Sequence, residues 1–337
     1  MRHLEPLQVG VIGAGYWGRK VAREVLGLSR GTGLAHLYSV ADNSPTILEQ
    51  CQNEFGPLNY RLDYKPLLSD SELSAVHICT PNPTHYDVAS SFLKAGKSVL
   101  VEKPLAVTSK EAYDLVRLAG EKKLVLSAGH IHRFNNGVRE LKRAMASGVL
   151  GKIYYLRFRW TGLMPPQEWR DVITDLGPHP FDISNYLLGA WPNRITCRGK
   201  GYRTNLEEVA FINAEHFGSN VTTNIEVSWL DGEKNRELTV VGSEATAKLD
   251  CLEQKAVMIK GNNTTQIPID FSNTLRDEIL QFVECNLHSQ RNESYTNPAD
   301  GIVGAQVVRL LEATRESMVQ DRTVEVRLPL AEEILAR

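Results

Sequence analysis

The chain has 337 residues, of which 42% are hydrophobic and 23% are charged, and its formal net charge is −2. This composition is typical of a globular protein that is long enough for two domains with separate cores. The small net charge and the lack of a tract rich in lysine and arginine argue against a nucleic-acid partner, and every apolar run is too short to cross a membrane.

The first 130 residues alternate short apolar segments with amphipathic ones, a pattern that favours a doubly wound α/β fold with a parallel sheet. We assign residues 1–130 to this domain. The predicted strands are 8–12, 35–41, 59–61, 75–79, 98–101 and 124–128, of which 59–61 is the weakest. The predicted helices are 16–28, 44–55, 85–95 and 109–122.

After about residue 130 the pattern changes to a helix, a strand, a second helix and then a series of β-like segments with short connections. Short connections favour antiparallel neighbours, so we expect residues 131–337 to form an α+β domain. The predicted strands are 152–160, 194–202, 209–216, 221–229, 236–241, 245–251 and 255–260. The predicted helices are 136–147, 178–188, 275–288 and 300–320.

The cysteines indicate a reducing compartment because they are odd in number, scattered, and form no CxxC pair. The N-terminal residues enter a strand pattern almost at once, without the regions of a signal peptide. We therefore predict a cytoplasmic protein with no membrane partner. The five cysteines are Cys51, Cys79, Cys197, Cys251 and Cys285.

A glycine-rich segment, GAGYWG, follows the first strand and opens the first helix. Gly13 permits a tight turn, Gly15 lets a pyrophosphate approach the backbone, and Gly18 lets the helix pack on the sheet. The helix N-terminus adds free N–H groups and a positive dipole end. The context predicts a dinucleotide-binding Rossmann domain, with Tyr16 and Trp17 also at the cofactor; the alternative is a glycine-rich turn without a ligand.

Asp42 ends the second strand, where a carboxylate can accept hydrogen bonds from the adenosine ribose. It would repel the 2′-phosphate of NADP, and no arginine follows it immediately, so NAD is the favoured cofactor. The alternative is that Asp42 serves only as a helix N-cap or turn residue.

Two further polar segments, CTPNPTH at 79–85 and EKP at 102–104, follow the fourth and fifth strands. Ligands of open α/β sheets bind at the carboxyl ends of strands, so we expect Thr80 and Asn82 to meet the cofactor. His85 either contacts the cofactor or begins the following helix.

Lys103 is a candidate catalytic residue because an ammonium group beside a substrate hydroxyl can steady an alkoxide or relay its proton. Glu102 precedes it, is also placed at the cofactor, and could orient the lysine. The alternative is a solvated surface lysine.

Downstream, the segment DLGPH places Asp175 before Pro178 and His179. Proline suits the first turn of a helix, so His179 is expected near a helix N-terminus, where the dipole favours a neutral base. Asp175 could orient this imidazole, and the two residues suit removal of a hydroxyl proton. The alternative is an N-capping aspartate beside a packed histidine.

A metal site is conceivable because His130 and His132 form an HxH pair that could join His179 and Asp175. Hydride transfer with a lysine needs no metal, however, and the sequence contains neither HExxH nor a cluster of cysteine ligands. We therefore predict no metal.

Together these segments resemble the Gfo/Idh/MocA oxidoreductases, the family of glucose–fructose oxidoreductase and inositol dehydrogenase. The resemblance covers nearly the whole chain, and the combination of EKP with DxxxH is its specific part. It rests on GAGYWG at 13–18, CTPNPTH at 79–85, EKPL at 102–105, GHIHRF at 129–134 and DLGPH at 175–179.

The resemblance implies a Rossmann domain followed by a domain with an open, mostly antiparallel sheet that often forms an oligomer interface, hence a homodimer or homotetramer. It also implies that Lys103 is catalytic or positions the substrate, and that His179, paired with Asp175, is the acid/base. Substrates of the family are mainly sugars, cyclitols and nucleotide sugars, oxidised or reduced at a ring hydroxyl.

The sequence departs from the family where many members carry a glycine-rich stretch between a Trp-Arg pair and the aspartate. Here Trp169 and Arg170 are separated from Asp175 by only four residues, which leaves the role of Arg170 open. Arg157 and Arg159, with Arg170, would suit a phosphate-bearing substrate or could be solvated charges.

The leading hypothesis is an NAD-dependent dehydrogenase that acts on a secondary hydroxyl of a sugar or nucleotide sugar. The GHIHRF segment and the short loop resemble nucleotide-sugar dehydrogenases, including those acting on UDP-N-acetylglucosamine. The alternatives are a cyclitol or free-sugar dehydrogenase, an enzyme that recycles NAD within one turnover, and a non-catalytic NAD-binding sensor. A sensor has no need of Lys103, Asp175 and His179.

Overall fold

The computed structural model describes residues 5–167, 170–216, 218 and 220–336, and the chain forms two compact units. The first unit comprises Met1–His130, Leu275–Val308 and Pro329–Arg337, and the second comprises Ile131–Thr274 and Arg309–Leu328. The sequence predicts a second domain of 131–337, whereas in the structure the two C-terminal segments Leu275–Val308 and Pro329–Arg337 belong to the first unit.

The first unit contains a six-stranded sheet in the order β3-β2-β1-β4-β5-β6, and every pair in it is parallel. The order reverses between β1 and β4, which is where open α/β sheets bind their ligands. The doubly wound fold predicted from the sequence is confirmed. The strands are β1 (Leu7–Ile12), β2 (Ala35–Ala41), β3 (Asn59–Arg61), β4 (Ala75–Ile78), β5 (Ser98–Val101) and β6 (Leu126–Ala128).

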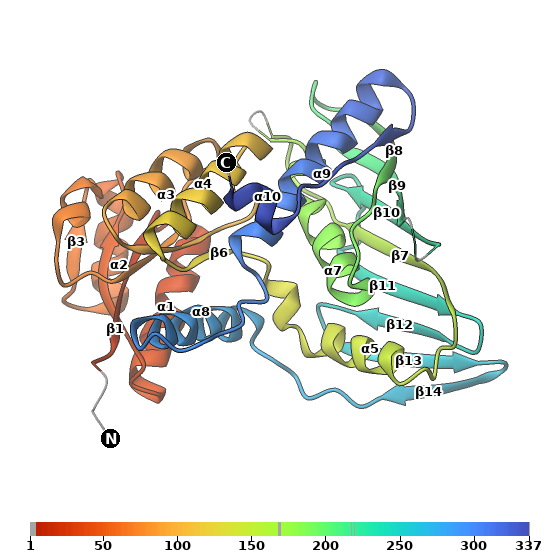
Figure 1. Cartoon of the computed structure of the whole chain (residues 1–337), viewed down its shortest axis with the longest axis horizontal. Coiled ribbons are helices and arrows are strands. Elements are labelled where there is room, and N and C mark those ends of the chain that lie inside the picture. The colour runs from red at the N-terminus through yellow and green to blue at the C-terminus, as the bar shows by residue number, and fades with distance from the viewer. Residues whose placement is uncertain (1–4, 168–169, 217, 219, 337) are drawn as a thin grey trace. The chain divides into compact units, whose positions relative to one another are not determined.

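Helices cover both faces of this sheet, with α1 and α8 on one face and α3 and α4 on the other (Figure 1). Burial on both faces explains why β4 and β5 are continuous apolar or buried runs with no alternation. The helices are α1 (Tyr16–Gly31), α2 (Pro45–Phe55), α3 (His85–Lys94), α4 (Ser109–Lys122), α8 (Thr274–Gln290), the first part of α9 (Gly301–Gln320) and α10 (Ala331–Leu335).

Apolar side chains explain why the C-terminal segments belong to the first unit. Ala305 and Val308 of α9 and Ile334 of α10 are buried in the same core cluster as the strands and helices α3 and α4. In addition, Arg276 of α8 forms an ion pair with Glu24 of α1. These contacts are long-range in sequence, so the pattern along the chain gives no sign of them.

The second unit contains a nine-stranded sheet in the order β14-β13-β12-β11-β7-β10-β9-β8-β15. The sheet is mostly antiparallel, as expected, but β7 is parallel to β10. The chain leaves β7 through two helices and two strands before β10 follows, and so long a connection permits a parallel pair. Strands β7 to β10 are Ile153–Thr161, Arg194–Lys200, Val209–His216 and Val221–Ser228; β11 to β15 are Asn235–Gly242, Thr246–Asp250, Lys255–Lys260, Asn263–Ile267 and Val324–Glu325.

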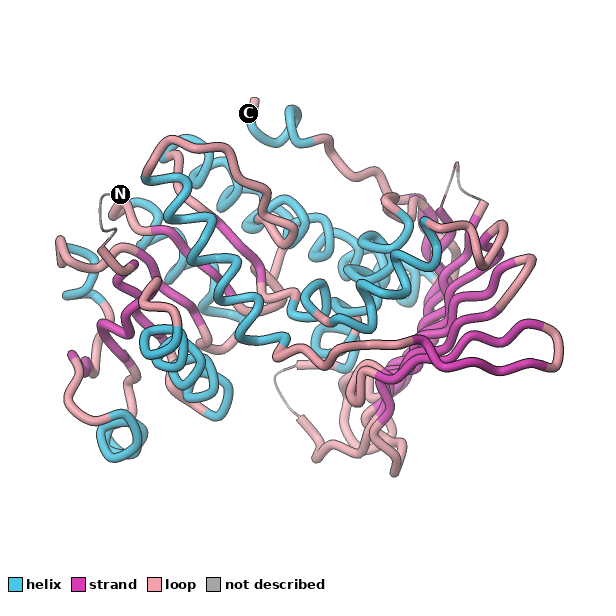
Figure 2. The backbone as a smooth tube through the Cα atoms, turned by 90° about the horizontal axis from the view of Figure 1, so that it is seen from below, coloured by secondary structure: helices cyan, strands magenta, loops and turns pink. Residues whose placement is uncertain are grey.

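Described helices lie against only one face of this sheet (Figure 2). Leu156, Phe158 and Trp160 of β7 are buried on the helix-covered face, whereas Arg157 and Arg159 point to the opposite face. The helices of this unit are α5 (Asn136–Ala146), α6 (Val172–Leu176), α7 (Pro178–Leu188) and the second part of α9.

Four short elements of the structure are not predicted by the sequence pattern: α6, α10, β14 and β15, which have two to five residues each. Segments this short hold too few residues to display a period. In the described part of the chain, no helix is long and apolar enough to span a membrane.

Candidate active site

The glycine-rich loop between β1 and α1 has the geometry of a phosphate-binding turn. Gly13 has φ +86°, and a Cβ there would lie 2.8 Å from the backbone of Cys79. A Cβ at Gly18 would collide with the carbonyl oxygen of Gly13, so the helix packs closely on the turn. A Cβ at Gly15, by contrast, would meet no atom within 4 Å. The loop therefore leaves open space in front of a helix N-terminus.

The first turn of α1 has its N–H groups available for an anion because no side chain caps the helix at Gly15. Tyr16 is 74% exposed at this end of the helix. The residues present therefore fit the pyrophosphate of a dinucleotide, as the sequence predicts.

Asp42 connects the phosphate loop to the start of α2. Its carboxylate accepts hydrogen bonds from the backbone N–H of Ala14 at 2.7 Å and of Ser44 at 2.9 Å. The N-cap of α2 is Ser44, so Asp42 is not the helix N-cap, whereas its bond from the Ser44 N–H is that of a turn residue. Each carboxylate oxygen can accept more than one hydrogen bond, and ribose binding by Asp42 stays a prediction.

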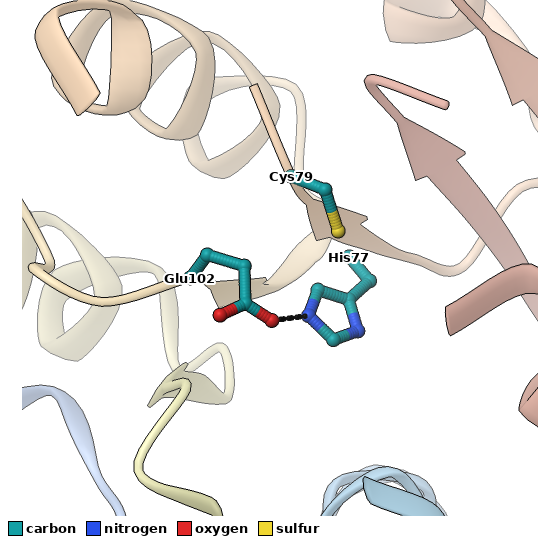
Figure 3. A group of neighbouring side chains, drawn as sticks. All are labelled: His77, Cys79 and Glu102. Atoms are coloured by element: carbon teal, nitrogen blue, oxygen red, sulfur yellow. Dashed lines mark hydrogen bonds and ion pairs between the residues drawn. The ribbon is translucent and has the colours of Figure 1, made fainter. Parts of the chain in front are cut away.

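A polar cluster lies at the carboxyl ends of β4 and β5, where Glu102, His77 and Cys79 point toward one another (Figure 3). Glu102 Oε1 accepts hydrogen bonds from Trp17 Nε1 at 2.5 Å and from His77 Nε2 at 3.0 Å. Burial would raise the pKa of Glu102, but the bonds from His77 and Trp17 outweigh it and hold that pKa below its usual value. Glu102 therefore connects the phosphate loop, β4 and β5.

Glu102 and Trp17 contact each other, since one oxygen of this carboxylate receives both the indole and the imidazole. The orientation of Lys103 by Glu102 and the contact of Trp17 with the cofactor stay predictions. We assign Glu102 to the support of the loop that carries Lys103, which is itself partly buried at the end of β5.

The same cluster is the one group of three potential metal ligands found in the described residues, with ligand atoms within 4.8 Å of one another. Burial, together with the nearby carboxylates of Glu102 and Glu278, raises the pKa of the Cys79 thiol well above its usual value. A protonated thiol is a poor ligand, and Glu102 already accepts two hydrogen bonds. The cluster is therefore best explained as a hydrogen-bonded support.

The loop after β4 places Thr80 and Asn82 partly exposed at the same sheet edge as the phosphate loop. His85 is fully buried and begins α3. Its two ring nitrogens each lie 2.8 Å from a backbone oxygen, one of Thr80 and one of Pro104, and burial lowers its pKa. Direct cofactor contact by His85 is therefore not supported; this side chain holds the loops after β4 and β5 together.

In the second unit, Asp175 and His179 lie in two successive short helices. Asp175 belongs to α6, and the N-cap of α7 is Gly177 with no side-chain cap, so Asp175 does not cap the helix that carries His179. Pro178 is the first residue of α7, which places His179 in the first turn as expected. His179 is partly exposed between the buried prolines on either side of it in the chain. A partly exposed imidazole at a helix N-terminus can exchange protons with a ligand.

Aromatic rings support the imidazole of His179. The His132 ring lies edge-to-face against it, with centroids 4.9 Å apart, and the Trp160 ring lies edge-to-face against His132 at 5.4 Å. The segment carrying His132 is tied to α7 by a buried ion pair between Arg133 and Asp182 at 2.5 Å. His132 therefore contributes to the position of His179.

Asp175 has two further partners that the sequence analysis did not predict. Trp229 Nε1 donates a hydrogen bond to one carboxylate oxygen at 3.3 Å, and an Arg170 nitrogen lies 3.1 Å from the other. The Arg170 guanidinium also lies over the Trp229 ring, 6.0 Å from its centroid. The role of Arg170, left open by the sequence, is to hold this carboxylate. Glu168 and Trp169 are outside the described residues.

Arg157 and Arg159 are not part of this group because they lie on the outward face of β7, where Arg159 pairs with Asp231. The alternation along β7 could have revealed this, since Phe158 and Trp160 occupy the opposite parity. Arg236 is the arginine that the sequence analysis missed: it pairs in register with Trp160 across β11 and β7.

The fold of the first unit and its phosphate loop define a dinucleotide-binding Rossmann protein. Residues 7–130 match the family model described as "Oxidoreductase family, NAD-binding Rossmann fold", and residues 138–248 match the GFO/IDH/MocA C-terminal domain. The chain therefore belongs to the GFO/IDH/MocA oxidoreductases, and its cofactor is NAD.

Relatives of known activity support the same class. The chain is 28% identical to scyllo-inositol 2-dehydrogenase (NAD(+)) of Bacillus subtilis, covering 83% of this chain and 86% of that protein. It is 26% identical to UDP-N-acetylglucosamine 3-dehydrogenase of Acidithiobacillus ferrooxidans, covering 90% and 94%. A solved structure of the latter superposes with a TM-score of 0.82, at 25% identity, covering 94% and 98%. The chain is thus an NAD-dependent oxidoreductase of the sugar and cyclitol dehydrogenase family.

Proposed function

We propose that this protein oxidises a secondary hydroxyl of a sugar or nucleotide sugar, with UDP-N-acetylglucosamine as the leading candidate. The observation that carries the proposal is the partly exposed His179 at a helix N-terminus, four residues after an Asp175 that is held by Arg170 and Trp229. A chain that only sensed NAD would not need a supported acid/base pair.

Each candidate residue has a distinct part in the reaction. A ring nitrogen of His179 takes the hydroxyl proton while the C–H bond breaks and the carbonyl forms. Asp175 stabilises the resulting imidazolium, and Lys103 steadies the negative charge that develops on the substrate oxygen. NAD bound to the first unit would accept the hydride. The reverse reaction uses the same groups in the opposite order.

The choice of a nucleotide sugar is supported by the relative that acts on UDP-N-acetylglucosamine, which matches over nearly the whole chain. A cyclitol or free sugar is the second candidate, supported by the scyllo-inositol relative at a similar identity. The two candidates differ in charge, because a nucleotide sugar carries a diphosphate and a cyclitol is neutral.

A substrate panel tests the proposal. Purified protein with NAD is assayed for NADH absorbance with UDP-N-acetylglucosamine, other UDP-sugars, N-acetylglucosamine, glucose and scyllo-inositol. We expect UDP-N-acetylglucosamine to give the largest kcat/KM. Preference for scyllo-inositol or a free sugar would support the second candidate, and no turnover with any compound would favour a sensor.

We predict that the protein binds NAD more tightly than NADP, because the Asp42 carboxylate at the end of β2 repels a 2′-phosphate. The change Asp42→Asn keeps the shape of the side chain and removes its charge. It should narrow the difference in affinity between the two cofactors, mainly by improving NADP binding. The dissociation constants are measured by titration of intrinsic fluorescence, and a parent that binds NADP more tightly contradicts the prediction.

We also predict a homodimer or homotetramer that forms through the outward face of the nine-stranded sheet. Described helices cover only the other face, and on this one Phe211 is 56% exposed beside charges of both signs. A second copy would bury Phe211 and pair those charges. Light scattering at micromolar concentration should give a multiple of the monomer mass, and Phe211→Glu should lower it. A monomeric parent protein refutes this.

A further inference from the structure

The helix-covered face of the second sheet carries a guanidinium group that forms no ion pair with any described residue. Arg236 is partly buried near the start of β11, and its Nη1 donates hydrogen bonds to the carbonyl oxygens of Thr161 and Asn235 at 2.8 and 2.7 Å. No carboxylate of a described residue lies within 4 Å of it. Carbonyl oxygens solvate this charge but do not neutralise it.

The surroundings of Arg236 are those of the candidate acid/base pair. Its guanidinium lies over the Trp160 ring, 6.0 Å from the centroid, and Trp160 contacts the His132 ring that supports His179. Burial lowers the pKa of Arg236, and the charge of Asp175 acts in the opposite direction. Arg236 and Asp175 are therefore close enough to interact electrostatically.

Asp175 is not a counterion in contact with Arg236. Its carboxylate is in contact with Arg170 at 3.1 Å, whereas Arg236 forms no ion pair with a described residue. Keeping a positive charge away from water is costly unless an anion accompanies it. A planar guanidinium suits the two oxygens of a carboxylate or phosphate, to which it can donate two parallel hydrogen bonds.

We propose that Arg236 binds an oxyanion of the substrate, either a sugar carboxylate or a phosphate. The inference rests on the proposed function and narrows it to acidic sugars, sugar phosphates and nucleotide sugars. Neutral sugars and cyclitols then become poor ligands, because they leave the charge of Arg236 without a counterion.

The test measures binding, so that it does not depend on turnover. The NAD-loaded protein is titrated calorimetrically with glucuronate, glucose 1-phosphate, UDP-N-acetylglucosamine and glucose. The same titrations are made with the variants Arg236→Gln and Arg236→Lys. The control variant is Arg194→Gln, which removes an exposed arginine of β8 that pairs with Glu215, four strands away from β11 in the sheet.

We expect at least one anionic compound to bind the parent at least about 10-fold more tightly than glucose. Arg236→Gln should weaken that compound by about 10- to 100-fold, the usual effect of losing a charged hydrogen-bond partner. Arg236→Lys should retain part of the affinity, and Arg194→Gln all of it. If glucuronate alone binds tightly, the oxyanion that Arg236 recognises is a carboxylate. If the phosphorylated compounds alone bind tightly, that oxyanion is a phosphate.

Equal affinity of the parent for glucose and the anions overturns the inference, and this comparison needs no variant to fold. An equal loss for glucose and the anions in a folded Arg236→Gln protein also overturns it, because Arg236 would then act on the site as a whole. If anions bind through Arg236 but no compound reduces NAD, the inference stands and the proposed function fails.

Discussion

The change His179→Ala should lower kcat by about 10²–10⁴ while NAD binding stays nearly intact. This is the usual loss for removing a general acid–base group. The helix α7 that carries His179 belongs to the second unit, whereas the phosphate loop belongs to the first. The single-turnover rate of hydride transfer is measured by stopped flow, with NAD affinity measured on the same preparation.

The control for this prediction is His288→Ala, which removes a partly exposed histidine of α8 that pairs with Glu293. It should leave the rate of hydride transfer unchanged. If His179→Ala kept nearly full turnover, His179 would not be the base, and Lys103 would become the candidate.

The change Lys103→Met should also lower kcat by about 10²–10⁴, because it removes the positive charge that steadies the substrate oxygen. Methionine keeps the length of the side chain, so the loop after β5 should hold its shape through Glu102 and His85. Thermal unfolding of the variant should match that of the parent.

The double variant Lys103→Met with His179→Ala tests whether both residues act in one step. Residues that act together lose much less in combination than the product of their separate losses. We therefore expect a double variant that is about as slow as the slower single one. If the fold-loss in kcat of the double variant equalled the product of the two single losses, the two residues would act independently.

Local patterns in the sequence predict most of the architecture. The strands 35–41 and 98–101 and the helices 109–122 and 178–188 have the bounds seen in the structure. These elements have strong periodicity or clear end signals, such as the capping box of Thr108 with Glu111. The return of α8, α10 and part of α9 to the first unit depends on contacts between distant residues, which a local pattern does not encode.

The candidate site was predictable as a set of motifs but not as a set of partners. The sequence points to Asp175 and His179, yet Trp229, which contacts Asp175, lies 54 residues later in the chain, just after β10. Arg236 of β11 lies over Trp160 of β7, far from it in the sequence. Glu102 is likewise found beside Trp17 and His77 only once the parallel strands are in register. Such partners are determined by sheet topology, and no spacing between residues that are close in the sequence predicts them.

Oxidation of the proposed substrate requires that hydride passes from one of its carbons to NAD. Its most direct test is mass spectrometry of the reduced cofactor formed by the parent protein from UDP-N-acetylglucosamine that is deuterated at every carbon of the sugar ring. We expect the reduced cofactor to carry the extra mass of one deuterium, and its formation to be slower than with the unlabelled sugar. Failure to form reduced cofactor, or reduced cofactor without deuterium, would contradict oxidation of this sugar by hydride transfer.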